Sequence, residues 1–174
     1  MALPERMKFG IFMAPFHALG ENPNLSYHRD LELMEWLDYL GFDEAWIGEH
    51  HSAGWETICS PELFIAAAIE RTKTLKLGSG VSSLPYHHPL MTANRFIQLD
   101  HHSRGRVMLG VGPGALTGDA YMMGIVPTEQ RPMMQEAAWL IKRLMTETEP
   151  ITYKSKWFTL EEAHVHLRPY TYPH

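Results

Sequence analysis

The sequence predicts an α/β fold: parallel β/α units of a TIM (β/α)8 barrel, with about the first four units present as a half barrel. Short apolar segments alternate with helical patterns, as they do in parallel sheets covered by helices. The apolar segments begin at residues 8, 43, 75 and 106, so their starts lie 35, 32 and 31 residues apart. A barrel of about 250 residues allots roughly 31 residues to each unit. An open, doubly wound sheet that is complete in itself is the alternative.

Four segments rich in apolar and β-branched residues have the composition of buried strands. They are Lys8–Met13, Asp43–Gly48, Leu75–Val81 and Arg106–Val111. The third segment contains Gly78 and Gly80. Glycines inside a strand predict a bulge or the close approach of another group, although a strand that simply has to curve would also contain them.

Helical patterns separate the strands, and each has an apolar stripe. The first ends at Gly41, and the second begins at Ser60-Pro61 with serine as the N-cap. The third runs from Pro89 to about Arg104, and the fourth from about 132 to 145. The stripes are Leu33, Trp36, Leu37 and Leu40; Phe64, Ala67 and Ala68; Phe96, Ile97 and Leu99; and Ala137, Leu140, Ile141 and Leu144.

We expect a single domain over residues 1–174. Residues 1–149 hold the four β/α units, and residues 150–174 form a hairpin and loop segment, because the pattern after Pro150 indicates short antiparallel strands. Four parallel strands from a barrel leave two unpaired edges and an apolar inner face. A half barrel would therefore take its missing half from another chain, as in a homodimer, or rearrange.

Composition excludes several classes of protein. The net charge of −5 and the absence of a Lys/Arg stripe argue against a nucleic-acid partner. No apolar run is long enough to span a bilayer, and the N-terminus lacks the order of a signal peptide, so we expect a cytoplasmic protein. Cys59 is the single cysteine, which excludes an internal disulfide and a cysteine zinc site.

Polar residues collect in the loops that follow the four strands. These loops are Ala14–His17, Gly48–His51, Ser82–Pro89 and Gly112–Ala115, and three of the four contain histidine. Functional residues of β/α barrels lie at the C-terminal ends of the strands. The sequence therefore predicts a functional face at this edge of the sheet.

A metal site is not expected on this face. Adjacent histidines in an extended segment point in opposite directions, so the doublets at 50/51, 87/88 and 101/102 are poor chelates. His164 and His166 have the spacing that places both rings on one side of a strand, but a solvated pair in a polar hairpin explains them as well.

The stretch 110–115 satisfies the G-x-G-x-x-G/A pattern of dinucleotide-binding loops and follows a strand. The pattern also requires a helix to begin there, so that its N-terminus meets the pyrophosphate. Residues 116–131 contain Gly118, Gly124 and Pro127, which leaves room for at most one short helix. We interpret the stretch as a tight turn whose backbone a flat or anionic ligand can approach.

Glu49 and His50 end the second strand beside aromatic residues, namely Phe16, Trp46, Trp55 and Tyr86. A histidine next to a carboxylate is suited to proton transfer at neutral pH. The alternative is that Glu49 and the histidines only hold the backbone of their loop.

Taken together, these segments resemble the flavin-dependent, bacterial-luciferase-like monooxygenases, most closely the limonene-monooxygenase-like group. The resemblance covers nearly the whole chain. It lies in "MKFGIF" at the first strand, "GFDEAWIGEHH" at 41–51, "RTKTLKLGSGVSSLPYHHPL" at 71–90, "LDHHSRGRVMLGVGPG" at 99–114 and "LRPYTYPH" at the end.

The resemblance implies roles for individual residues. His50 would be the catalytic acid/base beside the flavin ring, with a non-prolyl cis peptide at Gly80–Val81 beneath that ring. Ala14, Glu49 and the loop of Gly112, Pro113, Gly114 and Ala115 would bind the cofactor, the loop lying against its phosphate. Pro113 replaces an arginine that luciferase has there, so one phosphate contact is lost. Phe16, Trp55 and Tyr86 would line the substrate pocket.

The resemblance also implies an activity: monooxygenation of a small apolar, terpene- or aldehyde-like substrate with O2 and reduced FMN supplied by a separate flavin reductase. Family members continue through four more units, and part of their flavin site follows the fifth strand, so we expect about half of a flavin site here. A deazaflavin (F420)-dependent oxidoreductase of the same barrel type is one alternative. A truncated half barrel that binds flavin or self-associates without turnover is another.

Overall fold

The computed structural model describes residues 6–14 and 16–172. Pro15 of the first predicted loop and the last two residues of the closing segment lie outside this range. Four parallel strands form one sheet in the order β1-β2-β3-β4, as predicted. They are β1 (Gly10–Met13), β2 (Glu44–Ile47), β3 (Lys76–Ser83) and β4 (Val107–Gly112). Strand β3 runs two residues beyond its predicted end.

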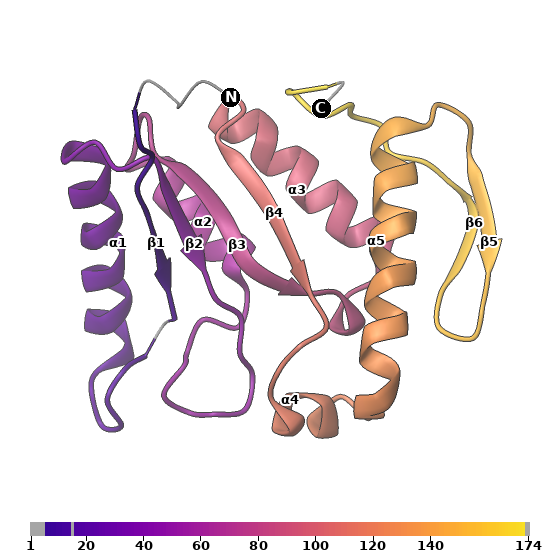
Figure 1. Cartoon of the computed structure of the whole chain (residues 1–174), viewed down its shortest axis with the longest axis horizontal. Coiled ribbons are helices and arrows are strands. Elements are labelled where there is room, and N and C mark those ends of the chain that lie inside the picture. Colours follow the sequence, from indigo (N-terminus) through magenta and orange to yellow (C-terminus); the bar gives the residue numbers. More distant parts are fainter. Residues whose placement is uncertain (1–5, 15, 173–174) are drawn as a thin grey trace.

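The helices alternate with the strands (Figure 1). They are α1 (Pro23–Tyr39), α2 (Pro61–Ile69), α3 (Pro89–Ser103), the short α4 (Thr117–Met122) and α5 (Gln130–Thr146), with 3-10 turns at Leu84–Tyr86 and Pro127–Glu129. Proline occupies the first turn of α1, α2 and α3, where its missing N–H costs no hydrogen bond. Ser60 is the N-cap residue of α2 as expected, but its side chain makes no capping hydrogen bond.

The first core cluster lies between the sheet and helices α1, α2 and α3. Its buried residues are Met13, Met34, Leu37, Ala45, Ile47, Ile58, Phe64, Ile65, Ala68, Ile69, Leu75, Leu77 and Leu99. The predicted stripes of α3 and α5 are buried as expected. Parallel β/α units bury one face of each helix against the strands, which accounts for this arrangement.

Two of the predicted stripes are partly wrong. On α1 only Leu37 is buried, whereas Leu33, Trp36 and Leu40 are exposed. The helix turns Met34 toward the sheet instead, so its buried face is rotated from the stripe that the sequence suggested. On α2 Ala67 is exposed, and the longer side chains of Ile65 and Ile69 fill the space against the sheet.

The opposite face of the sheet carries no helix within the described residues, and α2 and α3 lie behind the sheet in Figure 1. On this face Phe12 of β1 pairs with Trp46 of β2, and Trp46 pairs with Gly78 of β3. The Phe12 side chain is 63% exposed. A Cβ atom at Gly78 would come within 2.5 Å of the Trp46 ring, and one at Gly110 within 3.2 Å. The glycines therefore let the indole pack directly over β3 and β4.

The glycines of β3 mark an irregularity as well as a close approach. The pairing of β3 with β4 shifts register between Ser79 and Ser82, and the Gly80–Val81 peptide bond is cis. Both features agree with the expectations drawn from the sequence.

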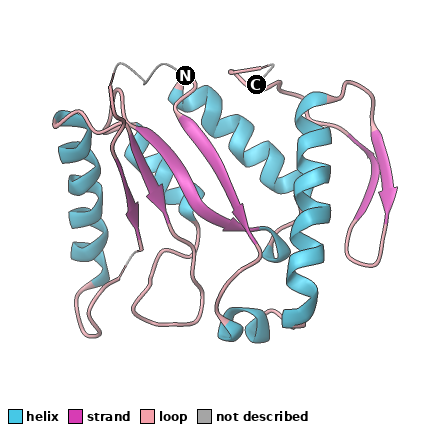
Figure 2. Cartoon of the chain, in the orientation of Figure 1, coloured by secondary structure: helices cyan, strands magenta, loops and turns pink. Residues whose placement is uncertain are grey.

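The predicted hairpin follows α5. Strands β5 (Ile151–Lys154) and β6 (Thr159–Ala163) pair antiparallel and lie beside α5 (Figure 2). A second core cluster joins them to the helix, and Trp139 of α5 meets Tyr153 edge-on. The hairpin thus extends the hydrophobic core beyond the sheet. Within residues 6–14 and 16–172, no helix combines the length and apolarity needed to cross a membrane.

Candidate active site

The carboxyl ends of the four strands meet at one edge of the sheet, which is the edge where Figure 1 shows the loops and α4. His50 lies directly after β2 at this edge. Its Nε2 is 3.3 Å from Oε2 of Glu56, and its Nδ1 is 3.6 Å from Oδ2 of Asp119. The Nδ1 atom is buried and has no hydrogen-bond partner within the described residues. The ring, 20% exposed, therefore keeps one nitrogen uncommitted between two carboxylates.

Asp119 is a buried carboxylate that lies outside every motif of the sequence. It lies on α4, and its Oδ1 accepts the backbone N–H of His51 at 3.2 Å. A Cβ atom at Gly118 would come within 2.7 Å of the Ser52 hydroxyl, so glycine allows α4 to pack this closely against the loop after β2. The sequence held no signal for Asp119, because its burial and its contact with the loop after β2 arise only in the folded chain.

Glu49 lies beneath this edge with its side chain fully buried. Its Oε1 accepts hydrogen bonds from the Nε2 atoms of His51 and His87, each at 2.8 Å. Its Oε2 accepts the Ser83 backbone N–H at 2.8 Å. The carboxylate thus joins the ends of β2 and β3, and it binds two imidazoles as well as loop backbone.

These contacts shift the protonation equilibria of Glu49 and His87 in opposite directions. Burial by itself would raise the pKa of Glu49, but the hydrogen bond and charge of His87, with the Ser83 N–H and His51, bring that pKa below its ordinary value. Burial by itself would lower the pKa of His87, but the hydrogen bond and charge of Glu49 raise it. The pair therefore favours a carboxylate and an imidazolium.

The loop of Gly112–Ala115 is fixed from two sides. Gln130 donates from its Nε2 to the Tyr86 hydroxyl at 2.9 Å and to the Pro113 carbonyl at 2.8 Å. Gly114 has a φ of +82°, and a Cβ atom there would lie 2.3 Å from the Tyr86 hydroxyl. A Cβ atom at Gly112 would lie 2.4 Å from Cγ2 of Val81. The two glycines therefore let this loop lie directly against Tyr86 and the cis peptide segment.

The helix after this loop explains why the dinucleotide pattern is incomplete. Helix α4 has six residues and no side-chain cap, so it does not provide the long helix that the fingerprint requires.

Tyr86 remains a neutral phenol over a wide pH range, because burial and the nearby Asp119 carboxylate raise its pKa. Within the described residues, no group of three or more His, Cys, Asp or Glu side chains is arranged to hold a metal ion.

The remaining predicted site residues lie at the surface of the same edge. Phe16 is 68% exposed and Trp55 is 42% exposed, and Ala14 and Ala115 are exposed as well. Phe16 forms an isolated antiparallel bridge with Glu56, which places the first loop beside the segment that carries Trp55. Gly80 and Val81 are partly buried.

The features that this edge presents fit one side of a flat, anionic cofactor. They are the His50 ring, which is 20% exposed, the glycines at which backbone approaches closely, and exposed aromatic side chains. A glycine-rich turn lets a flat ligand reach the backbone. Loops at the carboxyl ends of parallel strands are also the usual place for such a ligand.

Comparison with known proteins identifies relatives over nearly the whole chain. The family model described as Luciferase-like monooxygenase matches residues 7–174. The chain is 55% identical over 165 residues to 4-hydroxyprotoasukamycin monooxygenase of Streptomyces nodosus subsp. asukaensis, covering 95% of this chain and 44% of that protein. It is 52% identical over 166 residues to limonene 1,2-monooxygenase of Rhodococcus erythropolis, covering 95% and 43%.

A solved structure shows the same arrangement of units. The oxygenating constituent of 3,6-diketocamphane monooxygenase from Pseudomonas putida, in complex with FMN, superimposes with a TM-score of 0.83 at 29% identity, covering 88% of this chain and 43% of that one. The chain thus spans less than half the length of the relatives that it matches, and its four units correspond to half of their barrel. On this match, the chain belongs to the luciferase-like monooxygenase family.

Proposed function

We propose that this chain forms the His50-bearing half of a flavin-dependent monooxygenase that uses reduced FMN and O2. The observation that carries the proposal is the position of His50, held between Glu56 and Asp119 with Nδ1 free of hydrogen bonds. A histidine in this setting can hold and release one proton at a ligand beside it. Family membership supports the reaction class, and the related structure that contains FMN supports the cofactor.

In this proposal Gly80 and Val81 would support the cofactor ring, and the loop of Gly112, Pro113, Gly114 and Ala115 would hold its phosphate. Ala14 would contact the cofactor from the first loop, and Glu49 would act indirectly, through its hydrogen bonds to His51 and His87. FMN, reduced by a separate flavin reductase, would supply the electrons that activate O2. The chain's own side chains orient the ring, exclude water and hold the proton at His50.

The proposed substrate is a small apolar molecule of terpene or aldehyde type. Phe16, Trp55 and Tyr86 form the aromatic side of its pocket. Support comes from the relative named limonene 1,2-monooxygenase, at 52% identity, because close relatives tend to keep the chemical class of their pocket. Hydride transfer with a deazaflavin remains the alternative in the same barrel, and it would require no O2.

We further propose that two copies associate. The sheet has unpaired edges at β1 and β4 within the described residues, and Phe12 and Trp46 lie on its uncovered face. Apolar surface of this kind is normally covered by protein. A half barrel that self-associates and binds flavin without turnover is the alternative from another class.

The test combines light scattering with gel filtration in the presence and absence of FMN. The proposal expects a discrete dimer that retains the visible absorbance of flavin through the column. Reduced FMN with O2 and limonene should then give an oxygenated product, and none without O2. A colourless protein, or O2-independent reduction of a carbonyl substrate with reduced F420, would contradict the proposal.

A further inference from the structure

Gln130 joins two parts of the candidate active site that follow different strands. It is the first residue of α5, and its side chain is buried. Its Nε2 atom donates to the Pro113 carbonyl at 2.8 Å and to the Tyr86 hydroxyl oxygen at 2.9 Å. Pro113 follows β4, and Tyr86 lies in the turn after β3. The amide therefore fixes the position of the Tyr86 hydroxyl relative to the loop after β4.

The direction of both hydrogen bonds follows from the groups involved. A carbonyl oxygen can only accept, so the amide of Gln130 must present its NH2 group to Pro113. This nitrogen accepts no hydrogen bond, so the oxygen of Tyr86 must be the acceptor of its second hydrogen. The Tyr86 hydroxyl keeps its own proton to donate, and no acceptor for that proton is found within residues 6–14 and 16–172.

The hydroxyl lies directly against the loop of Gly112–Ala115. A Cβ atom at Gly114 would be 2.3 Å from the hydroxyl oxygen, so the hydroxyl stands where a side chain of residue 114 would otherwise be. The φ of Gly114 is +82°, a conformation that glycine adopts without strain. The sequence therefore leaves room at this loop for one phenolic O–H.

The loop itself is poor in groups that bind an anion. Between Val107 and Gln130 the chain contains no Lys, Arg or His. Pro113 has no backbone N–H, and its carbonyl is bonded to Gln130. An anion at this loop would therefore depend on neutral donors, which are the remaining backbone N–H groups and any hydroxyl beside them.

Tyr86 is suited to be such a donor. Burial and the nearby Asp119 carboxylate raise its pKa, so the hydroxyl keeps its proton at neutral pH. A hydroxyl that accepts one hydrogen bond is polarised and donates more strongly. A hydrogen bond to a charged acceptor is also stronger than one to a neutral group. The bond from Gln130 thus prepares the Tyr86 O–H for an anionic partner.

We propose that the Tyr86 hydroxyl binds the phosphate of a flavin at the loop of Gly112–Ala115, and that Gln130 is the positioning residue that holds this hydroxyl in place. The inference rests on the proposed function, which assigns the phosphate of FMN to this loop. It adds a donor from outside the loop. The ring of Tyr86 can still line the substrate pocket, because the ring and the hydroxyl are different parts of the side chain.

The first test measures binding of FMN and of riboflavin, which lacks the phosphate, by flavin fluorescence. Tyr86→Phe should weaken FMN binding about tenfold and leave riboflavin binding unchanged, because it removes one hydrogen bond to a charged group. The control is Tyr39→Phe, which changes an exposed tyrosine of α1. A wild-type chain that binds both flavins equally, or an FMN-to-riboflavin affinity ratio that Tyr86→Phe does not change, would overturn the inference and leave the proposed function intact.

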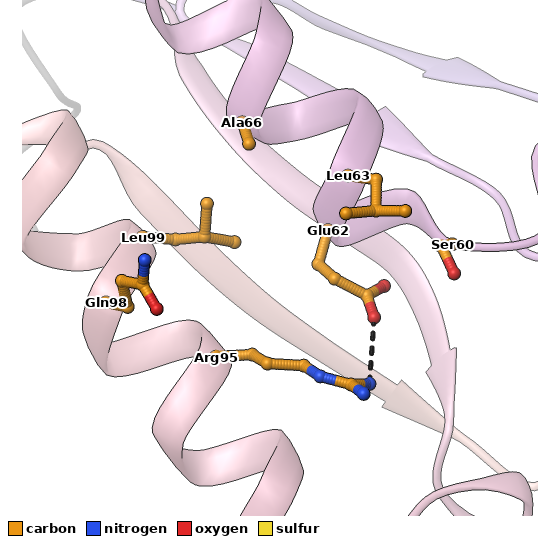
Figure 3. Close-up of a pocket in the computed structure, with 7 residues that line it drawn as sticks. All are labelled: Ser60, Glu62, Leu63, Ala66, Arg95, Gln98 and Leu99. Atoms are coloured by element: carbon orange, nitrogen blue, oxygen red, sulfur yellow. Dashed lines mark hydrogen bonds and ion pairs between the residues drawn. The ribbon is translucent and has the colours of Figure 1, made fainter.

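The second test separates positioning from a structural role of Gln130. Gln130→Met keeps the length of the side chain without its donors, so it should weaken FMN binding roughly threefold and riboflavin binding much less. It should add little to the loss in Tyr86→Phe, because it acts through that hydroxyl. The control is Gln98→Met, at an exposed amide of α3 that lines a cleft of about 250 Å³ between α2 and α3 (Figure 3). Equal losses for the two flavins would overturn the positioning role.

Inorganic phosphate provides a probe that needs no flavin. The backbone amide signal of Gly114, followed by NMR, should move when phosphate is added to the wild-type chain, and much less in Tyr86→Phe. Chloride at the same ionic strength is the control. This result in a chain that binds neither flavin would contradict the proposed function alone. A signal that responds equally in the two proteins, or in neither, would overturn the assignment of Tyr86.

Discussion

Two histidines at the same edge of the sheet lie among carboxylates, and their hydrogen bonds differ in completeness. His17, which is 5% exposed, uses both ring nitrogens: Nε2 is 2.8 Å from Oδ2 of Asp30, and Nδ1 is 2.8 Å from the Thr57 hydroxyl. His50 has longer approaches of 3.3 and 3.6 Å and a free Nδ1. A histidine with both nitrogens satisfied is built into the structure, whereas one with a free nitrogen can still exchange a proton.

The largest expected effect is on turnover and concerns His50. His50→Ala should lower kcat roughly 10²–10⁴-fold, because it removes the proposed acid/base, and should change the free energy of unfolding by about 1 kcal/mol or less. The measurement is product formation with reduced FMN and O2, with His28→Ala as the control. Unchanged turnover in His50→Ala would end the catalytic assignment.

His17 should show the opposite profile. His17→Ala leaves Asp30 and the Thr57 hydroxyl without their partner and opens a cavity, so it should cost roughly 3 kcal/mol of folding stability. Urea unfolding checks this against His28→Ala, which should stay within about 0.5 kcal/mol of wild type. If His17→Ala were as stable as its control, the number of hydrogen-bonded ring nitrogens would not distinguish a structural histidine from a reactive one.

The comparison extends to two glycines with positive φ. Gly114→Ala should cost roughly 2 kcal/mol, because its Cβ meets the Tyr86 hydroxyl in addition to the backbone strain. Gly124 has a φ of +67° with open space around its Cβ position, so Gly124→Ala should cost about 1 kcal/mol. Only Gly114→Ala should also weaken FMN binding, measured by titration, and equal affinities would argue against a cofactor at this loop.

The smallest expected effect is the pH dependence that the Glu49–His87 pair adds to stability. The pKa of Glu49 is lowered from 4.5, so its contribution is present above pH 4.5 and is lost as the pH falls. The pKa of His87 is raised from 6.5, so its contribution is present below pH 6.5 and is lost as the pH rises.

The pair should therefore stabilise the protein most between pH 4.5 and 6.5. Urea unfolding of wild type and His87→Gln across this range provides the measurement. The difference in unfolding free energy should peak inside the window. A difference that does not vary with pH would mean that the pair contributes no charge interaction.

Most of the fold could be predicted because its signals are local. The strands, their spacing and the change of pattern after Pro150 each lie within a few tens of residues. The buried face of α1 could not be predicted in this way. The helix carries two apolar stripes, and only packing against the sheet selects Met34 over Leu33 and Trp36.

The candidate site was predictable where it depends on strand ends. His50, Glu49 and the Gly80–Val81 cis peptide were expected at this edge, the last from family resemblance. The partners of these residues were not, because Asp119 comes from α4 and His87 from the turn after β3. No periodic pattern links Glu49 with His87, 38 positions away, or His51 with Asp119, 68 positions away, so only the folded chain brings them together.

The indole of Trp46 lies where side chains at Gly78 and Gly110 would otherwise stand. An ordinary pleated surface offers ridges and grooves that lock a neighbour in one position. Here the relief over β3 and β4 comes from one indole ring in place of two separate side chains, and the exposed Phe12 stands beside it on β1. Whatever covers this face must therefore contact Trp46, so a change in Trp46 fluorescence would report the moment of contact.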